Sequence, residues 1–436
     1  MSNIERVIGR QVWDSRGRPT VEAEVHLAGG ATGRAIAPSG ASTGSAEALD
    51  LRDGGKRLKG FGVNQAVANV NQPIQALLKG MNALDQQAID QALIAADGTP
   101  QKTHFGGNAC VAVSSAVAWA AAAAQSIPLW QHLATLAGHG ISPPALPVPM
   151  IQIFGGGAHA GGRIDIQDFL VICQGADSFA QAVEWTAEIY LAAQAIMKAK
   201  GKLAGVCDEG GLWPDFERNE DGLELLTQAI GQAGLKAGTE VGIALDVAAS
   251  EFLQDGKYHF RCENRSLSAQ ELIALQIEWC ERYPIISLED PLAETDREGF
   301  IAITEALGDR VQIVGDDFLT TNAARVRAAA EVGAGNAVLL KSNQCGTLSE
   351  LIDACLTAKS FGWNTVVSGR SGESEDTTLS HLAFGLDGGQ IKVGSITRSE
   401  RNCKWNEVIR LEENLGTAAQ LWRFAPPQAR TQERAC

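Results

Sequence analysis

The segment PIISLED, residues 284–290, has the apolar run of a short buried strand and stops at two acidic residues. The same pattern recurs in the second half of the chain, where the polar residues that end each run follow one another at intervals of 22 to 43 residues. That interval fits one strand, one helix and their loops. Longer helical patterns, such as SAQELIALQIEWCERY at 268–283, lie between the runs. We therefore predict parallel strands linked by helices in an α/β barrel. The other five runs are VGIALDV (241–247), VQIVGDD (311–317), AVLLKSN (337–343), TVVSGRS (365–371) and GQIKVGS (389–395).

In such a barrel the carboxyl ends of all strands meet on one face, so the residues that end these runs should lie together. The predicted site combines carboxylates with cationic side chains. Its members are Asp246, Glu289, Asp316, Lys341, Arg370 with Ser371, and Lys392.

Taken singly, each acid has a structural explanation: Asp246 could cap a helix beginning near Ala248, and Asp316 could lie in an ordinary turn. Three converging carboxylates are different, because like charges at short range are costly unless a cation neutralises them. Oxygen ligands of this kind favour Mg²⁺ and also accept Mn²⁺.

Lys341 or Lys392 could act as a general base beside such a metal, because burial and a nearby cation both lower the pKa of an ammonium group. The alternative for either lysine is a structural ion pair with the carboxylates. The segment GVCDEGGLWPD, 205–215, adds Glu209 between small residues that allow close approach to a ligand. An acid on one side and a lysine on the other would support anti elimination of water.

Upstream, RPTVEAEVHLAGG (18–30) alternates apolar and polar residues like a half-buried strand, and helical patterns follow from Asn64. Glycine and proline then cluster in GHGISPPALPVPM, 138–150. We therefore predict an α+β domain over residues 1–137 and a barrel domain over residues 138–436.

Composition narrows the functional classes. The net charge of −15 argues against a nucleic-acid partner, which would need a basic face. The N-terminus MSNIERVIGR lacks the apolar core of a signal peptide, and the alanine-rich run 109–125 is better explained as a buried helix than as a membrane span. We expect a cytoplasmic protein without a membrane partner. Its nine cysteines contain no CxxC pair, which indicates reduced thiols.

Nine motifs spread over nearly the whole chain resemble those of the enolase family in order and spacing. The resemblance implies an α+β capping domain followed by an eight-stranded α/β barrel, two Mg²⁺ sites, and assembly into a homodimer or a larger ring. The motifs are DSRGRPT (14–20), APSGASTGSAEALDLRDG (37–54), DEGGLWPD (208–215), ALDVAASEF (244–252), SLEDP (287–291), VGDD (314–317), LLKSNQ (339–344), SGESEDTT (371–378) and IKVGSITRSER (391–401).

The resemblance also implies metal and catalytic roles. Lys341 would take the proton beside the substrate carboxylate, and Lys392 would neutralise that carboxylate. Glu209 would protonate the departing hydroxyl, with Asp168 beside it on the catalytic side. The residues implied for the first Mg²⁺ are Asp246, Glu289 and Asp316, and Ser42 would help to bind the second.

A phosphoryl group of the substrate would be held by Arg370 and Ser371, and His159 would close over it from a second loop. Gln167 is implied as a further substrate-binding residue, together with Ser42 and Lys392.

The chain departs from the enolase pattern around the leaving group and the phosphoryl group. The family's SHRSGE is SGRSGE here, so Gly369 replaces a histidine, and IQEF is IQDF, so Asp168 is one methylene shorter than glutamate. Gly369 has a simpler explanation, relaxation of the backbone at the strand end. The other departures are Gly155 in place of an asparagine, the added Arg163, and Cys207 and Trp213 around Glu209.

Three functions compete. An enolase converting 2-phosphoglycerate to phosphoenolpyruvate leaves Gly369 unexplained, and a non-catalytic binding protein predicts decay of the metal ligands, which are intact. The favoured hypothesis is a specialised paralogue that forms an enolpyruvate from a bulkier phosphorylated or phosphonylated acid. Carboxyphosphonoenolpyruvate synthase of phosphinate natural-product biosynthesis is such an enolase-like enzyme. Gly369 would then provide room and Arg163 would meet the added charge, unless Arg163 is simply a solvated loop residue.

Overall fold

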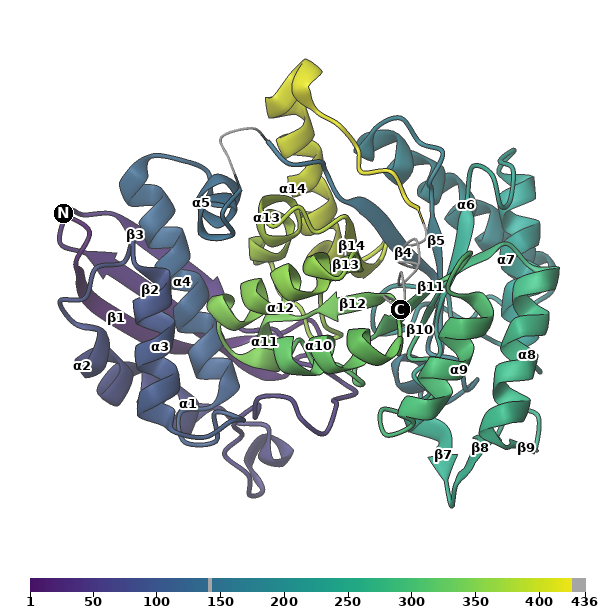
Figure 1. The fold of residues 1–436 in the computed structure, drawn as a ribbon, viewed down its shortest axis with the longest axis horizontal. Helices are drawn as coiled ribbons and strands as arrows, with labels where there is room; N and C mark the ends of the chain where they lie inside the picture. The colour runs from purple at the N-terminus through teal and green to yellow at the C-terminus, as the bar shows by residue number, and fades with distance from the viewer. Residues whose placement is uncertain (140–142, 426–436) are drawn as a thin grey trace, which may run out of the picture.

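The computed structural model describes residues 1–139 and 143–425. Two hydrophobic cores organise them, one in the N-terminal region and one inside a closed barrel. Figure 1 shows the small sheet and its helices at one end of the molecule and the barrel at the other. Between them lie α10 (Ala323–Val332), α11 (Ser342–Cys345), α12 (Leu348–Ser360) and α13 (Thr378–Gly385). The predicted boundary at residues 137 and 138 stays a prediction, and part of the glycine- and proline-rich segment, 140–142, lies outside the described residues.

The N-terminal region is an antiparallel sheet covered by helices. Its strands β1 (Ile4–Trp13), β2 (Pro19–Leu27) and β3 (Thr32–Ile36) pair in sequence order. The alternating pattern noted in the sequence forms β2 and its turn into β3. The helical segments of this region are η1 (Arg57–Gly60), α1 (Asn64–Asn69), η2 (Val70–Ile74), α2 (Gln75–Leu78), α3 (Gln86–Asp97), α4 (Gly107–Gln125) and α5 (Leu129–Leu136).

Helix α4 is the alanine-rich run and lies between the two cores. Ala116 and Ala120 pack in the N-terminal core, whereas Ala118 and Ala122 pack in the barrel core. The helix is long and apolar enough to cross a membrane by composition, but 83% of its apolar window is buried inside the protein. A helix that is apolar all round is expected where both faces meet a core, as here.

Eight strands close the barrel in the order β4, β5, β6, β10, β11, β12, β13, β14. All eight are buried along nearly their whole length, which explains their unbroken apolar runs. Their bounds are β4 (Val148–Gly155), β5 (Asp168–Ile172), β6 (Gly242–Asp246), β10 (Ile285–Glu289), β11 (Gln312–Gly315), β12 (Ala337–Leu340), β13 (Asn364–Ser368) and β14 (Gln390–Ser395).

The six strands predicted from the sequence run parallel, but the barrel as a whole is mixed because of β5. β5 runs antiparallel to both neighbours, β4 and β6, while the other adjacent strand pairs are parallel. Asp168 is the first residue of β5 and pairs with Gly155 and Asp246, the last residues of β4 and β6. The reversed direction therefore brings the start of β5 to the same edge as the ends of its neighbours.

Helices surround the barrel and begin with side-chain caps at several points, including a capping box formed by Ser268 and Glu271. The predicted helix over 268–283 is α8. A small antiparallel sheet, β7 (Leu253–Gln254), β8 (Lys257–Phe260) and β9 (Arg265–Leu267), follows the short helix η4 (Ala249–Phe252). The remaining helices are η3 (Gly157–Ala160), α6 (Phe179–Ala199), α7 (Glu220–Gln232), α8 (Ala269–Arg282), α9 (Arg297–Leu307), α10 (Ala323–Val332), α11 (Ser342–Cys345), α12 (Leu348–Ser360), α13 (Thr378–Gly385), α14 (Ser399–Leu415) and η5 (Gly416–Ala418).

The N-terminal region covers one edge of the barrel. Ser39 and Gly372 exchange two backbone hydrogen bonds of 2.9 Å, which dock the loop after β3 on the segment after β13. The same loop carries Ser42 towards the carboxyl ends of the strands. The eight cysteines within the described residues are free thiols, in agreement with the sequence, and Cys436 lies outside those residues.

Candidate active site

A narrow cavity at the carboxyl ends of the barrel strands gathers eleven of the fourteen predicted site residues. Two more, Glu289 and Asp316, contact the lysines of this cavity, and Arg163 lies elsewhere. The predicted residues that line it are Ser42, His159, Gln167, Asp168, Glu209, Asp246, Lys341, Gly369, Arg370, Ser371 and Lys392.

Acidic and basic side chains are paired at its floor. Lys392 Nζ donates to Asp246 Oδ2 at 2.9 Å and to Glu289 Oε2 at 2.7 Å. Lys341 Nζ donates to Asp316 Oδ2. All five side chains are buried, so these are the ion pairs that desolvated charges require. Asp246 caps no helix, because η4 begins without a side-chain cap.

The carboxylates that face the two lysines raise the pKa values of both. Burial lowers the pKa of Lys392, but Asp246, Glu289 and Asp168 raise it well above its usual value. Burial likewise lowers the pKa of Lys341, and the charge of Asp316 raises it, with a net increase. The predicted lowering concerns the site with a cation bound beside the lysines, and it stays a prediction.

The carboxylate groups at this floor fit Mg²⁺. Asp246, Glu289 and Asp316 supply hard oxygen donors, and burial followed by the charge of Asp246 raises the pKa of Glu289 well above its usual value. Glu289 Oε1 is buried and has no hydrogen-bond partner within residues 1–139 and 143–425. Such an oxygen has lone pairs available to a cation.

Two neighbouring acids were missed by the sequence argument. Oxygen atoms of Asp290, Asp316 and Asp317 lie within 4.8 Å of one another, although only one acid from each of the segments LED and GDD was assigned to the site. Asp290 accepts the backbone N–H of Asp316 and of Asp317 at 2.8 Å. It thereby fixes the turn after β11 that carries Asp316.

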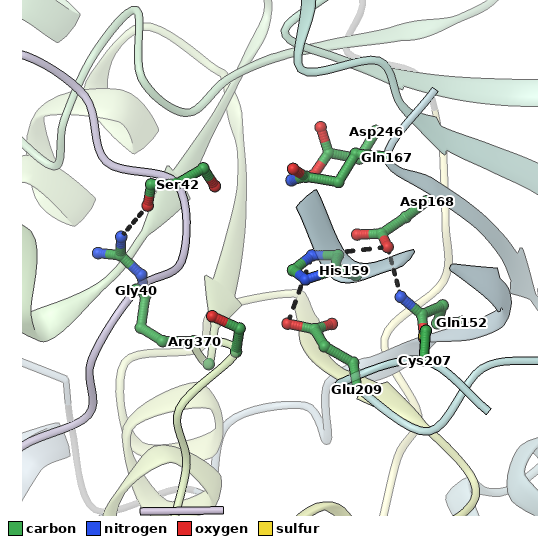
Figure 2. Close-up of polar contacts among 12 residues, drawn as sticks. Gly40, Ser42, Gln152, His159, Gln167, Asp168, Cys207, Glu209, Asp246 and Arg370 are labelled. Atoms are coloured by element: carbon green, nitrogen blue, oxygen red, sulfur yellow. Dashed lines mark hydrogen bonds and ion pairs between the residues drawn. The ribbon is translucent and has the colours of Figure 1, made fainter. Parts of the chain in front are cut away.

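The opposite wall holds an acid pair around His159 (Figure 2). His159 Nε2 lies 3.8 Å from Asp168 Oδ1 and 3.7 Å from Glu209 Oε1. Burial raises the pKa of Asp168 to about 6, against the lowering effects of His159 and Lys392. For Glu209 burial also raises the pKa, but the charges of His159 and Arg401 outweigh it and leave a net decrease. Two adjacent acids with opposite shifts are typical of a proton-transfer site.

A third wall carries the predicted anion-binding residues. Arg370 donates to the carbonyl of Ser42 at 2.8 Å and forms an ion pair with Glu47 at 2.8 Å. Ser371 Oγ accepts a 3.1 Å hydrogen bond from Arg16 Nη1. Glu47 and Arg16 were missed as individual site residues because they are more than 300 residues away in sequence, although both lie inside motifs that the sequence analysis quoted.

Comparisons with known proteins agree with this arrangement. Two family descriptions match the chain, "Enolase, N-terminal domain" over residues 4–133 and "Enolase, C-terminal TIM barrel domain" over residues 143–425. The chain belongs to the enolase family. The curated Enolase 1 of Desulfitobacterium hafniense (strain Y51) is 47% identical over 420 residues, which cover 96% of this chain and 95% of that relative. The protein is a hydro-lyase of the enolase superfamily, a family that uses Mg²⁺.

Gly369 marks the clearest departure from the enolase pattern and lines the cavity beside Arg370 and Ser371. A Cβ atom at this position would lie 3.0 Å from Glu373 Oε1 and 3.4 Å from Leu379 Cδ2. Glu373 in turn accepts the backbone N–H of Arg370 at 3.0 Å. A larger residue at 369 would therefore press on the group that fixes Arg370, besides filling the cavity.

Arg163, predicted to meet the added charge of a larger substrate, lies outside the cavity. Its Nη2 atom donates to Asp215 Oδ1 at 2.6 Å, and both side chains are about two-fifths exposed (38% and 40%). This contact corresponds to the simpler explanation, a solvated loop residue with a surface partner.

Proposed function

We propose that this enolase removes water from 2-phosphoglycerate to form phosphoenolpyruvate. The observation that carries the proposal is the placement of Lys341 and Glu209 in one cavity with Arg370 and Lys392. A base, an acid and two cations are what elimination from a phosphorylated hydroxy acid needs. The similarity to Enolase 1 along nearly the whole chain supports the same substrate.

The proposed reaction breaks one C–H and one C–O bond. Lys341, as the neutral amine that a cation bound beside it would favour, takes the proton from the carbon beside the carboxylate, and the freed electron pair forms the new C=C bond. The hydroxyl on the neighbouring carbon leaves as water after receiving a proton from Glu209, which has to carry that proton once substrate is bound; His159 faces both Glu209 and Asp168. Lys392 faces the substrate carboxylate.

The remaining residues would offset the negative charges of the substrate. Arg370, Ser371 and Arg16 form the phosphoryl-binding wall. Mg²⁺, when bound by Asp246, Glu289 and Asp316, with Ser42 beside a second ion, would supply positive charge where the carboxylate becomes doubly negative.

Phosphorus NMR of the protein with 2-phosphoglycerate tests this proposal. We expect Mg²⁺-dependent appearance of phosphoenolpyruvate, its loss on adding EDTA, and a rate lowered about 10²- to 10⁴-fold in Lys341→Ala, since a general base contributes that much. A wild-type protein that binds Mg²⁺ but leaves 2-phosphoglycerate unchanged would overturn it.

A larger phosphorus-containing acid, such as the precursor of carboxyphosphonoenolpyruvate, is a second candidate substrate. Gly369 favours it, because the missing side chain leaves space next to Arg370. Gly369→His should then lower kcat/KM for the carboxylated phosphorus substrate more than for 2-phosphoglycerate. Gly369→Ala serves as the matched control, since it adds only the atom that meets Glu373. Equal effects of Gly369→His on both substrates would contradict the idea that Gly369 makes room for a larger substrate.

We further propose a cytoplasmic homodimer or larger homo-oligomer, as is usual for enolases. Light scattering on the purified full chain would test the assembly, and a monomeric mass at micromolar concentration would exclude it.

A further inference from the structure

Three departures from the enolase pattern, at residues 155, 168 and 207, meet at one buried glutamine. Gln152 lies in β4, and its side chain is fully buried behind the wall formed by Asp168 and Glu209 (Figure 2). Its Nε2 atom donates to Asp168 Oδ1. Gln152 does not line the cavity itself. A buried amide of this kind has to satisfy both of its ends inside the protein.

Two donors fix which way the amide of Gln152 faces. Gly211 donates its backbone N–H to Gln152 Oε1 at 2.9 Å, and the Cys207 thiol donates to the same oxygen at 3.3 Å. Turning the amide around would place its NH₂ group against the Gly211 N–H. The NH₂ group therefore has to point at Asp168, and Asp168 has to accept.

Missing side chains create the room for these contacts. A Cβ atom on Gly155 would lie 2.2 Å from Cys207 Sγ, and one on Gly211 would lie 2.4 Å from Gln152 Oε1. Cys207 can occupy its place only because residue 155 is glycine. The two substitutions, more than 50 residues apart, form one structural unit.

We propose that Gln152 is a positioning residue for Asp168, and that Cys207 together with Gly155 locks the Gln152 amide in the orientation this task needs. Asp168 contacts groups on two sides: Oδ1 faces His159 at 3.8 Å and Oδ2 faces Lys392 at 3.7 Å. A rotation of its short side chain would change both distances. Gln152 thereby keeps the Asp168 carboxylate between His159 and Lys392.

This inference rests on the proposed elimination, and it separates the two halves of that reaction. Lys341 acts on the carbon-bound proton, whereas Asp168, His159 and Glu209 surround the departing hydroxyl. Loss of the Gln152 contact should therefore slow elimination while leaving exchange of the carbon-bound proton with solvent intact.

The test compares Gln152→Met with Gln276→Met. Gln276 is a matched control, because it is also fully buried and donates through Nε2, but to the carbonyl of Pro291, which does not line the cavity. In D₂O with Mg²⁺ and 2-phosphoglycerate, proton NMR follows deuterium exchange at the carbon and phosphorus NMR follows product. We expect Gln152→Met to lower kcat for product about 10- to 100-fold with little change in KM or in the exchange rate.

Two conservative replacements allow a rescue experiment, in which the second restores the kcat lost through the first. Gln152→Asn shortens the amide by one methylene and should break the contact with Asp168. Adding Asp168→Glu returns that methylene from the other side, and the double variant should recover at least tenfold in kcat over Gln152→Asn alone. Failure of this recovery, or a parallel loss of exchange and product in Gln152→Met, would overturn the positioning role.

The Gly155–Cys207 unit is tested by a double-mutant cycle. Gly155→Ala should lower both thermal stability and kcat for product, whereas Gly155→Ala combined with Cys207→Gly should lose less stability than the sum of the single changes. Additive losses would show that the two residues are independent. These outcomes remain distinct from the proposed function, which fails if the wild type does not convert 2-phosphoglycerate to phosphoenolpyruvate.

Discussion

Arg370 and Glu47 neutralise each other beneath the loop that carries Ser42. The two side chains are 3% and 6% exposed, so neither charge has enough water around it to stand alone. Burial lowers the pKa of Arg370, but Glu47 raises it above its usual value, and the guanidinium stays charged. An incoming anion would find a cation that already has a partner.

Glu47→Gln should therefore destabilise the unliganded protein by about 3–5 kcal/mol, because it leaves Arg370 buried without its counter-charge. Urea unfolding measures this loss. Adding inorganic phosphate should restore more stability to Glu47→Gln than to the wild type, since the anion replaces the missing carboxylate. Asp215→Asn, which breaks the exposed pair with Arg163, is the control and should cost no more than about 1 kcal/mol. Equal stability of Glu47→Gln and the wild type would contradict the expectation.

At the scale of elements, β3 packs directly on the backbone of α4. A Cβ atom on Gly33 would lie 2.2 Å from Ala120 N and 2.3 Å from Ala116 O. The small residues of α4 and the absent side chain of Gly33 together allow this close approach, and neither backbone can move independently of its own hydrogen bonds.

Gly33→Ala should destabilise the protein by about 1–3 kcal/mol or more, the usual cost of overpacking. Gly231→Ala is the matched comparison, because this exposed glycine in α7 has open space around it and an ordinary helical backbone. It should be neutral or stabilising by up to about 1 kcal/mol. Calorimetry of both variants checks the difference, and similar melting temperatures would argue against the tight contact.

Some features of these elements were predictable from the sequence and others were not. The ends of β6, β10 and β11 were predictable, because a barrel brings carboxyl ends together whatever their spacing. The direction of β5 was not predictable, since the apolar run DFLVI looks the same in a parallel and an antiparallel strand. Gln152 left a usable signal: a single polar residue inside the buried run VPMIQIFG must find hydrogen-bond partners. Glu47 carried no comparable signal, because its partner Arg370 is 323 residues away.

At the scale of the whole molecule, Asp90 joins the two regions. It lies on α3, accepts from Ser114 of α4 at 2.6 Å, and accepts from the N–H and hydroxyl of Ser349 on α12 at 2.9 and 2.7 Å. Burial raises its pKa above the usual value despite these donors. The folded protein therefore holds the proton of Asp90 more tightly than the unfolded chain does.

The sign of the pH dependence follows from that difference. The stabilising contribution of the protonated carboxyl should be full below the unfolded pKa, about 4, and should be lost as pH rises through the raised folded pKa. Relative to Asp90→Asn, which does not titrate, the wild type should lose melting temperature over this interval. A constant difference between the two melting temperatures from pH 4 to pH 8 would exclude Asp90 as the source.

The antiparallel direction of β5 has a consequence for how this protein can change over evolutionary time. The connection from β4 to β5 begins at Gly155 and ends at Asp168. Both residues lie at the end of the barrel that carries the candidate site, so the connection does not cross to the opposite end. Residues added or removed between these two points alter the reach and shape of the loop bearing His159, while both anchors keep their hydrogen-bonded register. New substrate preferences can therefore arise there through changes in length, without redesign of the barrel that supports them.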